Sequence, residues 1–334
     1  MSWENVLGRV AFANCDPIFD GLEDDWKILP APPSWLTGHL LRRDCITAPI
    51  PAADFAKHSD ELLLIPKLGI VSKGDVGSVI LFGTRPIEQM RDVALPSDSS
   101  TSRALLQWIL KSMKLDPKFH ERGPDLTAML DESDGALLIG DRALIAARDY
   151  PDLVKLDLGA EWTKKTGFPM VFGVFAARKD SPTSILNRAS NDMVNQYDVF
   201  LKNESWRNQV IKRTSLKLGF SESRISEYFS IEVQNKLDDF SKQGLEFFLK
   251  EVCGMDKKLL GSNLMNNSIL YLKHNSINRL QLHMIQQPQP RNHLGILLEY
   301  PLLPCLRLHP VPQQLHASPL HLQINLKVCR LMMA

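Results

Sequence analysis

Short apolar runs alternate with amphipathic segments through the first 254 residues of the chain. Runs that are rich in Val, Ile and Phe and end in polar or turn residues are typical of buried strands. We predict strands in residues 8–14, 45–50, 77–83, 92–95 and 168–178, and at the start of residues 135–147. The run at 8–14 ends in Asn14, which is typical of a strand that opens onto a site.

Helical periodicity fills the segments between these runs. We predict a short helix over residues 34–42, after two prolines, and another at the end of residues 135–147. A third helix follows a Ser/Thr cluster, and its apolar positions share one helical face: Ala104, Leu105, Trp108 and Ile109. From residue 183 to residue 252 the pattern is wholly helical. Strands that alternate with helices predict an α/β architecture with largely parallel sheets.

Two long apolar runs, at 77–83 and 170–177, bracket a middle segment of about 90 residues. This arrangement predicts a second lobe, residues 85–177, inserted into a first lobe made of residues 1–84 and 178–254. A ligand would then lie between the lobes, at strand ends and helix N-termini. Hinges are expected where the runs end, near residues 83–85 and 175–177.

Composition changes sharply after Met255. Residues 256–334 hold two acidic residues, seven prolines and six of the nine histidines, and no periodicity persists there. One interpretation is a metal-binding tail that uses His274, His283, His293, His309, His316 and His321. Their spacing fits no recognised ligand pattern, so we expect residues 255–334 to be a poorly ordered extension instead.

Charge and cysteine usage narrow the class of protein. The net charge of the 334 residues is +1, which provides no electrostatic footprint for nucleic acid or an anionic membrane. No run of about 18 apolar residues occurs, and Glu4 and Asn5 stand where a signal peptide needs basic and apolar residues. The five cysteines lack CxxC spacing, which favours reduced thiols. We therefore expect a cytoplasmic protein with a small-molecule substrate, without nucleic-acid or membrane partners and without a metal; the oligomeric state stays open.

A run of hydroxyls is the most informative local feature. Ser100, Thr101 and Ser102 directly precede the apolar positions of a predicted helix. Helix N-termini bind anions through free N–H groups, and hydroxyls add donors. An ordinary N-cap would need one serine, so a carboxylate or phosphate site stands beside the capping interpretation.

Three further polar residues lie at strand ends. Asn14 either makes a turn before Pro17 or donates to a substrate carboxylate or hydroxyl. Asp141 follows Gly140, where capping of the next helix is the preferred interpretation and substrate contact the alternative. Ser78 stands near the start of the run at 77–83. No GxGxxG, GxxxxGK[ST], HExxH or GxSxG motif occurs, so nucleotide, zinc-protease and hydrolase signatures are absent.

The order of several segments resembles a known family. The succession GRVAFANCDPIFDGL, PSWLTGHLLRRDCITAPIPAADFA, LGIVSKGDVGSVILFG, SSTSRALLQWIL, ALLIGDRAL and DLGAEWTKKTGFPMVFGVFAAR is similar to the chorismate dehydratases of the futalosine route to menaquinone. The resemblance covers residues 1 to about 254 and implies a two-lobed fold like the type 2 periplasmic solute-binding proteins. The related 1,4-dihydroxy-6-naphthoate synthase shares that scaffold but typically opens with a Cys-Pro-Asn-Asp run. The Asn14-Cys15-Asp16-Pro17 stretch therefore favours the dehydratase.

The resemblance implies a carbon–oxygen lyase without a cofactor. Its substrate chorismate would lose water to give 3-[(1-carboxyvinyl)oxy]benzoate. The residues expected to surround the dianion are Asn14, as the catalytic residue that positions substrate or water, and Ser78, Ser100, Thr101, Ser102 and Asp141. A carboxylate of the substrate is expected to take the proton, since a neutral amide has little basicity.

The chain also departs from the family's sequence pattern in two places. Family members commonly carry a Ser-Ser pair where this chain has Pro51-Ala52, and the segment after Gly254 resembles nothing in the family. A different class of function, a cytosolic module that binds a small carboxylate without chemistry, therefore stands as the alternative.

Overall fold

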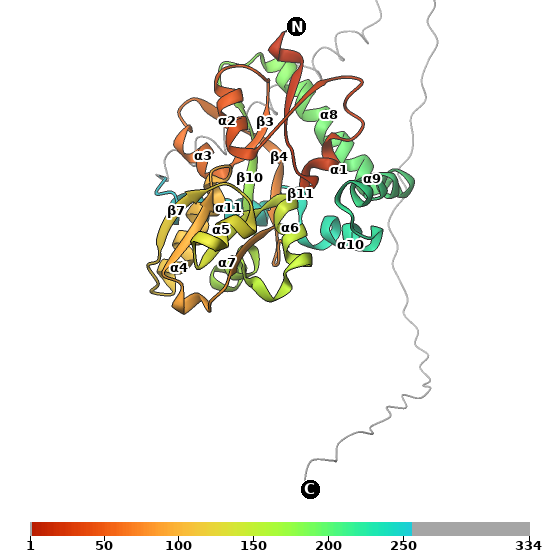
Figure 1. The fold of residues 1–334 in the computed structure, drawn as a ribbon. Helices are drawn as coiled ribbons and strands as arrows, with labels where there is room; N and C mark the ends of the chain where they lie inside the picture. The colour runs from red at the N-terminus through yellow and green to blue at the C-terminus, as the bar shows by residue number, and fades with distance from the viewer. Residues whose placement is uncertain (1, 256–334) are drawn as a thin grey trace, which may run out of the picture. The chain divides into compact units, whose positions relative to one another are not determined.

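A computed structural model describes residues 2–255 of the chain, and the predicted tail with its histidines lies outside these residues. The fold is mixed α/β (Figure 1). Its strands are β1 (Val6–Val10), β2 (Lys27–Ala31), β3 (Ala48–Pro51), β4 (Leu62–Ser72), β5 (Val79–Gly83), β6 (Asp92–Pro96), β7 (Lys118–Arg122), β8 (Gly135–Ile139), β9 (Val154–Asp157), β10 (Met170–Arg178) and β11 (Gln234–Lys236). Its α-helices are α1 (Asp16–Phe19), α2 (Pro33–Leu41), α3 (Ala52–Lys57), α4 (Ser100–Ser112), α5 (Leu126–Glu132), α6 (Gly140–Asp149), α7 (Leu158–Thr166), α8 (Thr183–Lys202), α9 (Glu204–Leu218), α10 (Glu222–Glu227) and α11 (Asp239–Glu251). Within the described part of the chain, no helix is both long and apolar enough to cross a membrane.

The described strands form three sheets. β1 pairs with β2, four strands follow the order β11-β4-β10-β3, and five follow the order β7-β6-β8-β5-β9. β6 runs parallel to β7 and β8, whereas β5 and β10 run antiparallel to both of their neighbours. The prediction of largely parallel sheets is therefore wrong. Directly before β5 and before β10, the chain passes from one sheet to the other. Neither strand therefore follows a helical crossover within its own sheet, which is the connection that makes neighbouring strands parallel.

The strand pairing also shows that the chain passes between the two larger sheets at other residues than the sequence predicted. β4 belongs to the four-stranded sheet and β5 to the five-stranded one, so residues 73–78 carry the chain across. The return runs from β9 through α7 and residues 167–169 into β10. The predicted hinges are contradicted, because residues 83–85 lead to another strand of the same sheet and residues 175–177 lie inside β10. The division into lobes at 1–84 and 178–254 against 85–177 stays a prediction.

The predicted elements before residue 183 are present, with shifted ends. The first strand ends at Val10, and a 3-10 turn, η2 (Ala13–Cys15), places Asn14 beyond it. The sequence pattern did not predict β4, because Pro66 interrupts its apolar run. The segment 183–252 is not wholly helical, since β11 interrupts it to pair with the edge of β4. Three residues are too few to show a strand period.

The core packs around β10, whose residues Met170 to Ala177 are all buried. Its continuous apolar run is explained by pairing on both sides and by helices that cover it. The wholly buried Trp162 of α7 makes an edge contact with Phe248 of α11, with ring centroids 5.9 Å apart. Helix α8 lies beside α1 (Figure 1), and its buried positions recur at helical spacing: Leu186, Ala189, Met193, Tyr197 and Phe200.

Candidate functional site

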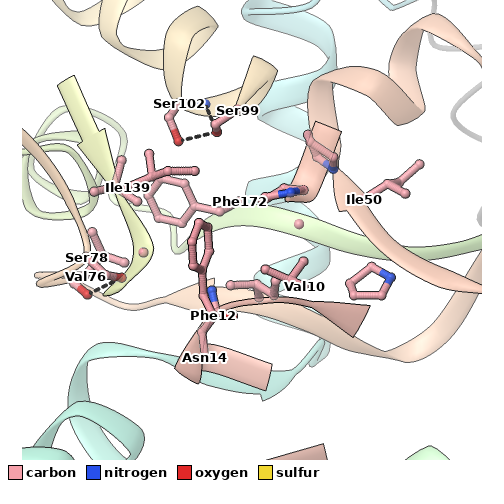
Figure 2. Close-up of a pocket in the computed structure, with 17 residues that line it drawn as sticks. Val10, Phe12, Asn14, Ile50, Val76, Ser78, Ser99, Ser102, Ile139 and Phe172 are labelled. Atoms are coloured by element: carbon pink, nitrogen blue, oxygen red, sulfur yellow. Dashed lines mark hydrogen bonds between the residues drawn. The ribbon is translucent and has the colours of Figure 1, made fainter. Parts of the chain in front are cut away.

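A largely apolar cavity lies where the ends of several elements converge (Figure 2); the space in it, with the open solvent at its mouth, is about 490 Å³. Contributions come from the segment after β1, the start of α2, strands β3, β4, β5, β8 and β10, and the N-termini of α4 and α6. The lining residues are Val10, Phe12, Asn14, Pro33, Pro49, Ile50, Pro51, Ile70, Val76, Ser78, Val79, Ser99, Ser102, Ile139, Gly140, Phe172 and Gly173. None of them is charged, so a ligand meets hydroxyls, one amide and main-chain dipoles.

Asn14 reaches this cavity from a turn that is fixed on both sides. The N–H of Ala13 donates to Oδ1 of Asp141 at 2.8 Å. The carbonyl oxygen of Asn14 accepts from Nδ2 of Asn235 at 3.0 Å. Its own side-chain Oδ1 is buried and has no hydrogen-bond partner. The site thus presents an immobilised amide whose oxygen is available to a donor on a ligand.

Two serines at the start of α4 also face the cavity. Ser99 is the N-cap residue: its Oγ accepts from the N–H of Ser102 at 3.3 Å and donates to Oγ of Ser102 at 2.8 Å. Residues three apart share a helical face, which explains why both side chains line the same cavity. The N–H of Ser100 donates to Oγ of Ser34 at 3.3 Å, so the hydroxyl proton of Ser102 and the positive end of the α4 dipole are what this helix start offers a carboxylate.

The neighbouring hydroxyls of the cluster point elsewhere. Oγ1 of Thr101 accepts from the N–H of Ala53 at 3.1 Å and so ties the first turn of α3 to α4. Ser100 lines a separate pocket, together with Ser34 and Arg103. Of the three predicted residues Ser100, Thr101 and Ser102, the structure brings Ser102 alone into the cavity lining.

Ser78 lines the cavity from the last position of the passage 73–78, directly before β5. Its Oγ donates to the carbonyl of Val76 at 3.2 Å and accepts from the hydroxyl of Tyr228 at 3.0 Å. Tyr228 is fully buried, and this burial raises the pKa of its hydroxyl far above the usual value. Tyr228 therefore stays a protonated donor that fixes the oxygen of Ser78.

Asp141 lies behind the cavity rather than in its lining. Besides the Ala13 N–H, its carboxylate has Nζ of Lys217 3.8 Å from Oδ2. Burial raises the pKa of Asp141, while the Ala13 hydrogen bond and Lys217 oppose that rise. The N-cap of α6 is Ile139, without a side-chain hydrogen bond, so the capping interpretation of Asp141 is wrong. The carboxylate instead holds the turn that carries Asn14.

Sequence reasoning missed the aromatic part of the site and the role of Ser99. Figure 2 shows the rings of Phe12 and Phe172 between the Ser99–Ser102 pair and Asn14. Gly140 has φ of +63°, and a Cβ atom there would lie 2.5 Å from the Phe12 ring. Glycine at 140 thus admits both the turn and the ring. Phe12 stands two residues before Asn14, a spacing that could have indicated a shared face, whereas nothing in the local sequence marks Phe172.

Metal ligands, the Pro51-Ala52 pair and the cysteines are the remaining candidates for a functional role. Among residues 2–255, no cluster of three His, Cys, Asp or Glu side chains could hold a metal ion. Pro51 lines the cavity at the position where the resembling family has its first serine of a pair, and Ala52 does not line it. The three described cysteines are unpaired.

Comparison with known proteins adds a family and a fold. Residues 6–252 match the model of a family described as menaquinone biosynthesis. Over 193 residues, 53% of this chain and 71% of the relative, the chain is 33% identical to the chorismate dehydratase of Thermus thermophilus.

Solved structures support the fold at low identity. A protein from Archaeoglobus fulgidus matches with a TM-score of 0.59 at 16% identity, over 75% of this chain and 98% of its own. The alkanesulfonate-binding protein of Xanthomonas axonopodis pv. citri matches with a TM-score of 0.54 at 15% identity, over 77% and 96%. A Candida albicans protein described as having the generic periplasmic binding protein fold matches with a TM-score of 0.51 at 13% identity, over 78% and 94%. The described residues therefore have the periplasmic-binding-protein fold that the family resemblance implied.

Proposed function

Because this chain belongs to the menaquinone-biosynthesis family over residues 6–252, we propose that it is a chorismate dehydratase. The proposed reaction converts chorismate to 3-[(1-carboxyvinyl)oxy]benzoate and water. The C3–H bond breaks and releases a proton, the C4–O bond breaks, and the departing hydroxyl combines with a proton to give water. The ring becomes aromatic, which makes the step strongly downhill. We also propose that the protein acts in the futalosine route to menaquinone and in the cytoplasm.

The observation that carries the proposal is an uncharged cavity with anion-binding dipoles. Aromatisation supplies the driving force, so the protein mainly needs to orient a dianion and manage one proton. The hydroxyl of Ser102, held in place by Ser99, and the N-terminus of α4 suit one carboxylate, and the cavity lining holds no strong base.

Each polar group then has a role in positioning. Asn14, with its main chain held by Asp141 and Asn235, orients the substrate or a water through its amide. A carboxylate of the substrate takes the C3 proton. Ser78, fixed by Tyr228, provides a further hydroxyl at the β5 side of the cavity.

Incubation of the protein with chorismate, followed by ultraviolet spectroscopy of the ring, tests this function. Formation of the aromatic product is the expected result. A thermal shift without product would instead favour the binding-module alternative, which the likeness to an alkanesulfonate-binding protein supports at the level of fold. The same assay with cyclic dehypoxanthinyl futalosine tests the dihydroxynaphthoate synthase activity.

A further inference from the structure

A second pocket lies between the start of β4 and the first half of α8; the space in it, with the open solvent at its mouth, is about 640 Å³. It shares no lining residue with the cavity described above: its lining is Leu63, Leu64, Ile65, Pro66, Lys179, Ser181, Thr183, Leu186, Asn187 and Ser190. A bulge in β4 makes its apolar wall. Val174 of β10 pairs with Gly69 but Ala176 pairs with Leu64, so residues 65–68 stand opposite a single residue of β10.

Two serine hydroxyls in this pocket have no hydrogen-bond partner. Ser181 is 8% exposed and Ser190 is 5% exposed, and the Oγ atom of each is buried and unpaired. Burying a hydroxyl without a partner costs free energy of folding. A serine inside a helix can bond to the carbonyl four residues earlier, but Ser190 does not. Both hydroxyls therefore retain a free donor and acceptor, and both residues line the same pocket.

The charge in this pocket favours an anion. Helix α8 begins here after Pro182, and no side chain caps it. The N–H groups of its first turn have no acceptor within the helix and carry its positive dipole. Lys179 adds an ammonium group, which donates to the carbonyl of Ser59 at 2.8 Å and retains further donors. No acidic residue lines the pocket.

We propose that this pocket binds an amphipathic carboxylate with a second polar atom. The carboxylate lies at the N-terminus of α8, beside Ser181 and Lys179, and the apolar body lies against Leu64 and Ile65. Ser190 is seven residues beyond the start of α8, about 10 Å along its axis, and bonds the second polar atom. An aromatic ring with polar groups at both ends fits this spacing. The proposal does not depend on the function of the larger cavity.

Calorimetric titration of the whole protein with 4-hydroxybenzoate and with benzoate tests the assignment. The Ser181→Ala variant should bind both probes about three- to tenfold more weakly, because it loses a bond to the carboxylate. The Ser190→Ala variant should lose affinity for 4-hydroxybenzoate by a similar factor but bind benzoate as before. The Ser100→Ala variant is the matched control, because Ser100 lines neither this pocket nor the larger cavity, and it should bind both probes as the parent does.

Three results would overturn the proposal. The first is an absence of binding by the parent protein at millimolar probe. The second is binding that neither Ser181→Ala nor Ser190→Ala changes, which would locate the probe elsewhere. The third is a fall of several degrees in the melting temperature of ligand-free Ser190→Ala, because that would show that its hydroxyl already has a partner in the protein.

Discussion

The carboxylate of Asp141 accepts a hydrogen bond from the main-chain N–H of Ala13, 128 residues earlier in the sequence. The contact joins the first turn of α6, next to the five-stranded sheet, to the turn that carries Asn14. Arg142, the next residue of α6, has its guanidinium 5.4 Å from the centre of the Phe12 ring and pairs with Asp98. Helix α6 therefore holds one side of the turn that positions the proposed catalytic amide, and Asn235 holds the other.

Loss of the Asp141 carboxylate should reduce turnover. Asp141→Ala leaves the Ala13 N–H without its acceptor, so we expect kcat to fall about tenfold or more, with a smaller change in KM. Asp141→Asn retains an acceptor oxygen and should retain more activity. Product formation from chorismate measures both, and Asn14→Ala provides the reference for a missing amide. Full activity of Asp141→Ala would show that the Ala13 contact does not position Asn14.

Adjacent hydroxyls of α4 should respond differently to substitution. Ser102→Ala removes a cavity donor, so substrate affinity should fall about tenfold while the melting temperature changes little. Thr101→Val leaves the Ala53 N–H unpaired and should cost about 1–3 kcal/mol of folding stability with little effect on affinity. Ser100→Ala, outside the cavity lining, is the control for both. Equal loss of affinity in all three variants would contradict this assignment.

Gly140 should tolerate a side chain less well than Gly167, although both have positive φ angles. The φ angles are +63° and +74°, so alanine is strained at either site. A Cβ atom at 140 would also meet the Phe12 ring, whereas at 167 nothing lies within 4 Å. Gly140→Ala should therefore lose more stability than Gly167→Ala, and should weaken substrate binding by displacing Phe12. Denaturant titration compares the two variants, and equal losses would show that the ring moves aside freely.

Asp20 should make the folded protein less stable as the pH rises. Burial, together with the nearby Asp16, raises the pKa of Asp20 to about 6, against the opposing charge of Arg213. A carboxyl whose pKa is raised on folding favours the folded state below its ordinary pKa of about 4, and that contribution is lost as the pH rises through about 6. Asp20→Asn should therefore melt at a higher temperature than the parent at pH 7, and the difference should shrink by pH 4. A variant that is less stable at pH 7 would show that the Arg213 pair outweighs burial.

The local sequence pattern was sufficient to predict most helices and strands and part of the candidate site. β5, β8, β10, α2 and α4 follow from apolar runs and helical faces, which depend on residues close in sequence. Strand direction and the passages between sheets depend on pairings such as Gly173 with Pro51, which no local period encodes. The local sequence pattern also cannot show which side chains of the site meet. Each helical residue turns about 100°, so four adjacent hydroxyls face different ways, and the partner of Asp141 lies on another element.

The central place of β10 determines the order in which the molecule can be built. The five-stranded sheet uses residues 79–157 alone, whereas the four-stranded sheet joins β3 and β4 to β10, about a hundred residues later in the chain. During synthesis the five-stranded sheet can form before β10, the partner of both β3 and β4, is made, and Gly173 of β10 then closes that part of the cavity lining. Hydrogen exchange during refolding should show protected amides in β6 and β8 before those of β10. Until that closure, the edges of β3 and β4 are unpaired, and this is the interval in which the nascent protein is most exposed to aggregation.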